Sequence, residues 1–154
     1  MIPSEPDSFL KSAETLVDAA HINAVSMFTP LLDQFSILHK VDVEHWDFIL
    51  TVAGVFVATI RVAHLDLEED RAEELLEAVF ESLIQWNSDG KRALDDCYQL
   101  FGSEFNRLNE VGHEKRFLVS DAVGIWIVLN VLGRQPQTEE ECKLVRASGT
   151  MVTH

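Results

Sequence analysis

The sequence predicts an all-α protein: a single-domain bundle of five or six helices with two largely apolar helices at its centre. Apolar residues recur every three or four positions over most of the chain, and its four prolines and seven glycines mostly fall between these stretches. With 154 residues, 47% of them hydrophobic, the chain has the usual size of one domain and enough apolar residues for a core. We therefore expect residues 1–154 to form one domain.

Capping residues and a proline set the expected helix boundaries in the N-terminal half. The first helix should begin after Ser4 and end or kink at Pro30, because proline lacks the N–H that a helix interior needs. Asp42 is a candidate N-cap for a second helix over 43–64. This segment is rich in β-branched residues, which also suit strands, but residues 41–65 contain no proline and one glycine. Without a turn to separate two strands, a helix is the preferred interpretation.

The middle of the chain is expected to form two helices joined by a tight turn. The third helix is predicted over 67–86, and the Asn87–Gly90 segment has the composition of a turn. The fourth helix follows it and has the clearest amphipathic pattern, with Leu94, Phe101 and Phe105 on one face. These three side chains are therefore expected to anchor this helix in the core.

Two further helices are expected near the C-terminus. The fifth should reach Gly133, and a short sixth should open with a capping box formed by Thr138 and Glu141 and end before Gly149. Residues 1–6 and 149–154 are expected to fray, as chain ends commonly do.

The chain is strongly acidic. Its 26 Asp and Glu residues against 12 Lys and Arg give a formal net charge of −14. Nucleic acids and anionic membrane surfaces are unfavourable partners, because contact with phosphates relies on clustered Lys and Arg. A basic protein is the partner that this charge favours, and we expect neither nucleic-acid nor membrane binding.

Cysteine usage and the first residues indicate a cytoplasmic protein. Cys97 and Cys142 make no disulfide framework, and residues 1–7 lack the basic and apolar regions of a signal peptide. Apolar segments occur at 48–60 and 117–132, but both fall short of the ~20 uninterrupted residues that cross a bilayer. They are therefore interpreted as core helices.

The sequence contains no recognised catalytic or nucleotide-binding motif. H-E-x-x-H, C-x-x-C, G-x-S-x-G, the P-loop and G-x-G-x-x-G are all missing from it. The sequence thus favours a non-enzymatic protein without a cofactor.

One weak candidate for a metal site lies on the first helix. Glu14, Asp18 and His21 follow at steps of four and three, so they share one side of that helix, and carboxylate and imidazole groups suit Zn, Mn, Fe or Ni. One helix alone cannot complete such a site. The preferred interpretation is that the three residues border the apolar face on a solvated flank.

The second helix carries a narrow strip of small and polar residues. Asp47, Thr51, Gly54, Ala58 and Arg61 lie along it, whereas the rest of the circumference is large and apolar. Such a strip either lines a polar pocket or lets two helix backbones approach closely, and we favour the close approach, with Asp47 and Arg61 at solvated ends.

The third helix has a dense anionic face. Glu73, Glu77 and Glu81 repeat every four residues, and Ile84 is close to them in azimuth. An apolar side chain inside a rim of carboxylates is typical of a protein-binding surface, where a few anchors carry most of the affinity. The alternative is an ordinary solvated face of an amphipathic helix.

From these features we expect a non-enzymatic interaction protein that binds a basic partner through Glu73, Glu77, Glu81 and Ile84. Its role would be that of an adaptor, a regulator, or an inhibitor of the immunity or antitoxin kind. The alternative is a small metal-dependent or ligand-binding helical bundle. A homodimer is also expected, because two fully apolar helices are hard to cover within so short a chain.

Overall fold

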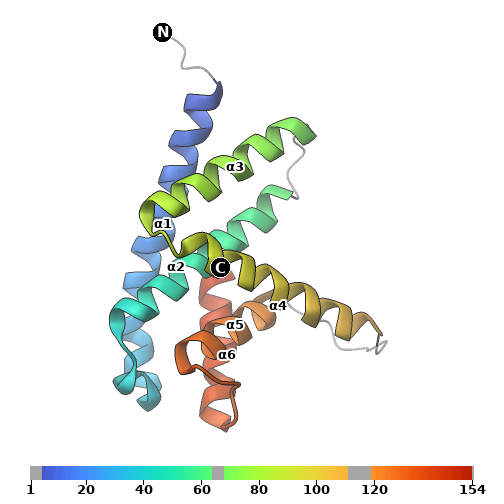
Figure 1. The fold of residues 1–154 in the computed structure, drawn as a ribbon. Helices are drawn as coiled ribbons and strands as arrows, with labels where there is room; N and C mark the ends of the chain where they lie inside the picture. The colour runs from blue at the N-terminus through green and yellow to red at the C-terminus, as the bar shows by residue number, and fades with distance from the viewer. Residues whose placement is uncertain (1–4, 64–67, 111–118, 154) are drawn as a thin grey trace.

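The computed structural model describes residues 5–63, 68–110 and 119–153. In chain order its elements are α1 (Glu5–Gln34), the 3-10 helix η1 (Ser36–Lys40), α2 (Val43–Ala63), α3 (Glu69–Trp86), α4 (Gly90–Glu110), α5 (Val119–Leu132) and α6 (Glu139–Thr153). These residues form helices and no strand (Figure 1), so the predicted all-α bundle is confirmed.

The apolar helix α2 forms the centre of the bundle. It packs against α1, α3, α4, α5 and α6 and completely buries Trp46 and Phe56. The second apolar helix, α5, packs against α2, α4 and α6 and buries Trp126 and Ile127. Both helices predicted to be central therefore contribute to the core, and α5 and α6 lie toward the end of the molecule opposite the N-terminus (Figure 1).

Most helix boundaries match the sequence, and three do not. Asp42 caps α2 as predicted: its Oδ1 accepts a hydrogen bond from the Glu44 N–H at 3.2 Å. Pro30 does not end α1, which continues to Gln34 because Leu31 in its last turn is buried in the core. The start of α3 lies at Glu69, two residues later than predicted, with Glu68 as its N-cap. Ser4 and Asp66, the residues just before the expected starts of the first and third helices, lie outside the described residues.

The third difference is α6, which runs to Thr153 instead of ending before Gly149. Two glycines explain this length. A Cβ on Gly124 would lie 2.0 Å from the Val145 carbonyl oxygen, and one on Gly149 would lie 1.9 Å from that of Ser120. Gly149 is thus a contact point where the backbones of α5 and α6 meet, and it is buried within the helix that it was expected to terminate.

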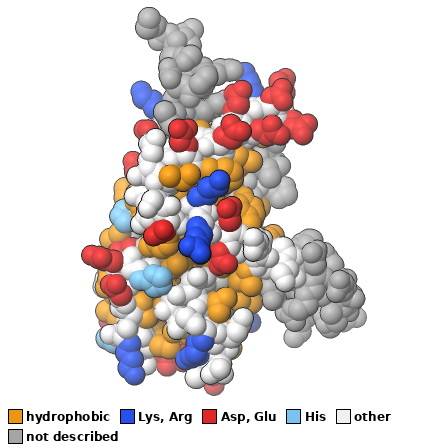
Figure 2. Space-filling model, in the orientation of Figure 1, with side chains coloured by type: hydrophobic (Ala, Val, Ile, Leu, Met, Phe, Trp, Pro, Cys, Tyr) orange, Lys and Arg blue, Asp and Glu red, His pale blue; other side chains and the backbone are white. Residues whose placement is uncertain are grey.

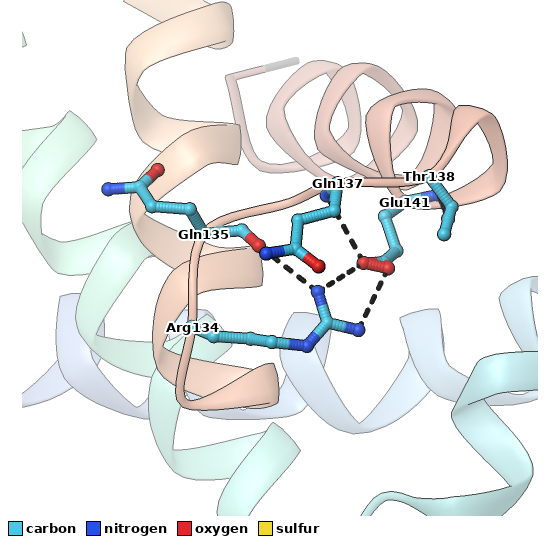
Figure 3. A network of polar contacts seen from close by, with 5 residues as sticks. All are labelled: Arg134, Gln135, Gln137, Thr138 and Glu141. Carbon is cyan, nitrogen blue, oxygen red and sulfur yellow. Dashed lines mark hydrogen bonds and ion pairs between the residues drawn. The ribbon is translucent and has the colours of Figure 1, made fainter.

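The connection between α5 and α6 is held by one buried carboxylate (Figure 3). α5 ends at Leu132, one residue before the predicted Gly133, which has a φ of 74°, a conformation that glycine adopts without strain. Thr138 Oγ1 then accepts the Glu141 N–H at 3.1 Å, which confirms the expected cap of α6. Arg134 Nη1 donates to Glu141 Oε1 at 2.5 Å, and the Gln137 N–H donates to the same oxygen at 3.3 Å. Glu141 is only 1% exposed, and the Arg134 guanidinium holds its pKa at about 2.

The first half of α4 packs its amphipathic face into the core. Leu94 is completely buried, as predicted. Phe101 is half-buried, and its ring meets that of Phe56 edge-on with centroids 5.3 Å apart. The side chain of Phe105, the third expected anchor, lies outside the described residues. The later turns of α4 extend away from the body of the bundle (Figure 1).

By length and composition alone, α2 would suffice to cross a membrane over residues 43–62. The prediction from sequence considered only residues 48–60, and the longer window is interrupted by Glu44, Asp47 and Arg61. However, 56% of the apolar window is buried inside the bundle, and a core helix passes the same test. One such helix is weak support for a membrane span.

Candidate functional site

The four residues predicted to bind a partner form an exposed stripe along α3. Glu73, Glu77, Glu81 and Ile84 follow at steps of four, four and three, which places them on one face of the helix. The three glutamates are exposed, and Ile84 is 41% exposed. We call these four residues the α3 stripe. Asp and Glu side chains gather over the first turns of α3, near the start of the stripe (Figure 2).

The stripe leads into a groove at its Ile84 end. This hollow has a volume of about 880 Å³ and lies between the end of α3, the start of α4, α2 and α5. Ile84, Phe48 and Ala93 supply apolar walls, and charged and polar groups surround them. The polar lining consists of Ser88, Asp89, Lys91, Arg92, Asp95, Asp96, Gln99 and Asn130. We call this hollow the α3–α4 groove.

A tight turn brings the two walls of this groove together. The Asn87 N–H donates to the Leu83 carbonyl at 2.9 Å and ends α3, while Asn87 Oδ1 accepts the Asp89 N–H at 2.9 Å. Gly90 then starts α4 directly against α3, since a Cβ there would lie 2.8 Å from Leu83 Cγ. The predicted turn at 87–90 therefore also determines how close the two helices approach.

The groove holds charges of both signs, with acids in excess. Asp89, Asp95 and Asp96 line it together with Lys91 and Arg92. The carboxylate of Asp96 is held in place, because Trp126 Nε1 donates to its Oδ2 at 3.0 Å. With the three glutamates of the α3 stripe, this surface is net negative and has an apolar centre. It is suited to a segment that carries positive charge around an apolar side chain.

The metal candidates on α1 do not come together. Among residues 5–63, 68–110 and 119–153, no group of three or more His, Cys, Asp or Glu side chains could hold a metal ion. Glu14 and Asp18 are exposed, whereas His21 is half-buried, with Nδ1 3.3 Å from Thr51 Oγ1 and its ring 5.4 Å from that of Trp86. A shared side of one helix is therefore not enough to form a metal site, because no other helix among the described residues contributes ligands to it.

His21 instead belongs to a polar contact between α1 and α2. The Thr51 hydroxyl donates to the Asp47 carbonyl at 2.6 Å, so its oxygen is left to accept from His21 Nδ1, which must carry the proton. The Asp47 carboxylate lies nearby with Oδ1 buried and without a hydrogen bond. Burial raises the pKa of Asp47, and the neighbouring His21 opposes this rise.

The strip on α2 proves to have two parts. Asp47 and Thr51 form the polar contact with His21, so Asp47 is not the freely solvated end that we expected. At Gly54 the backbones of α1 and α2 come close, since a Cβ would lie 3.2 Å from Ala20 Cβ. Farther along, Gly54, Ala58 and Arg61 line a hollow of about 250 Å³. The preferred interpretation, close approach of two backbones, agrees with the contact at Gly54. The hollow beyond it is lined mainly by apolar residues, unlike the polar pocket of the alternative.

Sequence reasoning missed the α3–α4 groove because its walls come from four separate segments of the chain. The local signal was the turn at 87–90, followed on the first turns of α4 by the basic pair Lys91 and Arg92 and the acidic pair Asp95 and Asp96. Comparison with known proteins adds no family: no family model matches the chain, and no significant match was found among curated proteins or solved structures.

Proposed function

We propose that this protein is a non-enzymatic interaction protein that binds a basic protein partner through the α3 stripe and the α3–α4 groove. Its role would be that of an adaptor, a regulator, or an inhibitor of the immunity or antitoxin kind. The observation that carries the proposal is the course of the stripe: three exposed glutamates lead to Ile84, which is exposed at the wall of an 880 Å³ groove.

In this proposal the exposed carboxylates and the apolar residues affect different rate constants of binding. Exposed carboxylates attract a basic partner over a distance and raise its association rate, an effect that salt weakens. Ile84 and Phe48 would receive an apolar side chain of the partner, and burial of such an anchor mainly slows dissociation. The partner need not neutralise every acid of the groove, because Lys91 and Arg92 already offset part of its negative charge.

The test begins with capture of binding proteins from an extract of the native cell at low and at high salt. Association and dissociation rates of a captured protein are then measured with purified variants. Glu77→Lys/Glu81→Lys should lower the association rate by roughly tenfold at low salt and flatten its salt dependence. Ile84→Ala should leave the association rate unchanged and speed dissociation by roughly tenfold or more.

Glu14→Lys/Asp18→Lys is the matched control, because it reverses two exposed acids at the same spacing on another helix. This control should change the association rate much less than the α3 reversal. Equal effects of both pairs would show that only net charge matters, which contradicts the proposed site. Unchanged rates in both the α3 reversal and Ile84→Ala would remove α3 from the interface.

A further inference from the structure

Another hollow is formed by the end of α1 and one face of α6. It has a volume of about 590 Å³, within the range of ~300–1,000 Å³ typical of small-molecule sites. Leu31, Ala147 and Met151 supply its apolar lining, and the exposed thiol of Cys142 lies beside them. We call this hollow the α1–α6 groove.

Two cations, Lys143 and Arg146, line this groove together with one acid, Glu139. Lys143 forms an ion pair with Glu139 at 3.4 Å, four residues earlier on α6. Arg146 is exposed and makes no hydrogen bond or ion pair with the described residues. Its guanidinium is therefore available to a ligand, and its planar N–H groups match a carboxylate in a bidentate arrangement.

We propose that the α1–α6 groove binds a free medium-chain fatty acid. The alkyl chain lies against Leu31, Ala147 and Met151, and the carboxylate meets Arg146, the cation of this groove that is not paired with Glu139. The alkyl stems of both cations extend the apolar surface that the chain contacts. The groove thus offers a cation to an anionic head and an apolar lining to an alkyl tail. The site goes beyond the proposed partner binding, since it shares no residue with the α3–α4 groove.

The two cysteines provide a built-in measurement of occupancy. Cys142 is exposed in the groove, so a ligand there shields its thiol from a neutral alkylating reagent such as N-ethylmaleimide. Cys97 is buried, and burial raises the pKa of its thiol, which keeps it unreactive in the folded protein. Alkylation of Cys97 thus reports unfolding in the same sample.

The experiment measures the alkylation rate of Cys142 by mass spectrometry at increasing concentrations of decanoate, below those that form micelles. Decanoate at saturation should slow the reaction at least fivefold without exposing Cys97, and decanol should protect far less because it lacks the carboxylate. Arg146→Gln should raise the half-protecting concentration of decanoate by roughly five- to tenfold, as expected for loss of a charge-assisted hydrogen bond.

Lys11→Gln is the control for loss of one positive charge. Lys11 is an exposed cation on α1, twenty residues before Leu31 and thus about 30 Å away along the helix. This variant should bind decanoate like the unaltered protein. The proposal is overturned if decanoate leaves the Cys142 rate unchanged, if decanol protects equally well, or if Lys11→Gln weakens protection as much as Arg146→Gln. None of these results bears on α3, so this proposal and the proposed function can fail separately.

Discussion

Glycine allows close helix contact both in the α5–α6 pair and at the α3–α4 corner, but only the first region buries a charged side chain. At the first, two glycines bring the backbones of α5 and α6 into contact, and Glu141 is buried. At the second, Gly90 brings the start of α4 against α3, yet a groove stays open beside the turn and the acids around it remain exposed.

The difference follows from the free-energy cost of burying a charged side chain. A buried carboxylate needs partners, and Glu141 obtains them from the Arg134 guanidinium and the Gln137 N–H. The charged residues of the α3–α4 groove would require as many partners if the helices closed over them, so they stay in water. One region is therefore specified by packing, whereas the other keeps a surface free for binding.

The largest effect should come from adding a methyl group where α5 and α6 meet. Gly149→Ala places its Cβ within 1.9 Å of the Ser120 carbonyl oxygen, so the helices must separate. We expect the free energy of unfolding to fall by ~3 kcal/mol or more, the upper end for overpacking. Urea denaturation followed by circular dichroism measures this change.

Gly102→Ala on α4 is the matched control, because nothing lies within 4 Å of the added Cβ. Alanine is favoured over glycine inside a helix, so this variant should be more stable by ~0.5–1 kcal/mol. A Gly149→Ala protein that is as stable as Gly102→Ala would show that α5 and α6 are not in backbone contact.

The next effect concerns the attachment of α4 to the core. Leu94 is completely buried, so Leu94→Ala should lower the free energy of unfolding by ~2–5 kcal/mol. Phe101 is half-buried, and Phe101→Ala should therefore cost less than Leu94→Ala, although the aromatic side chain is larger. Gln99→Ala, at an exposed position of the same helix, should change stability by under ~0.5 kcal/mol. A greater loss for Phe101→Ala would place the main anchor of α4 farther along the helix.

The smallest effect is a dependence of stability on acid pH. Folding lowers the pKa of Glu141 from its ordinary 4.5 to about 2, so its ionised form stabilises the fold above pH ~4.5. This contribution is lost as the pH falls from there through about 2. The stability difference between the unaltered protein and Glu141→Gln should accordingly shrink over that range.

Arg134→Gln tests the cause of this shift, because the Arg134 guanidinium contributes most to it. This variant should raise the pKa of Glu141 and move its loss of stabilisation to higher pH. Denaturation midpoints between pH 2 and 6 check both variants. A constant difference between the unaltered protein and Glu141→Gln across this range would contradict the assigned ion pair.

Features that depend on neighbours in sequence were predictable. The spacing of apolar residues predicted the helices, Asp42 and Thr138 were recognised as caps, and the steps between Glu73 and Ile84 placed the α3 stripe on one exposed face. Each of these depends on helix geometry within a few turns, which a single segment of chain determines.

Features that depend on which helices meet were decided only by the tertiary structure. Gly149 resembles a helix terminator in sequence and becomes a packing contact because α5 lies against it. Glu14, Asp18 and His21 share a helix face, yet His21 contacts Thr51 and Trp86 of neighbouring helices. The α3–α4 groove has walls from four segments, so no local pattern contains it. A side chain's environment is set by elements distant in sequence, and the same local spacing therefore permits a metal ligand, a buried contact or a free surface.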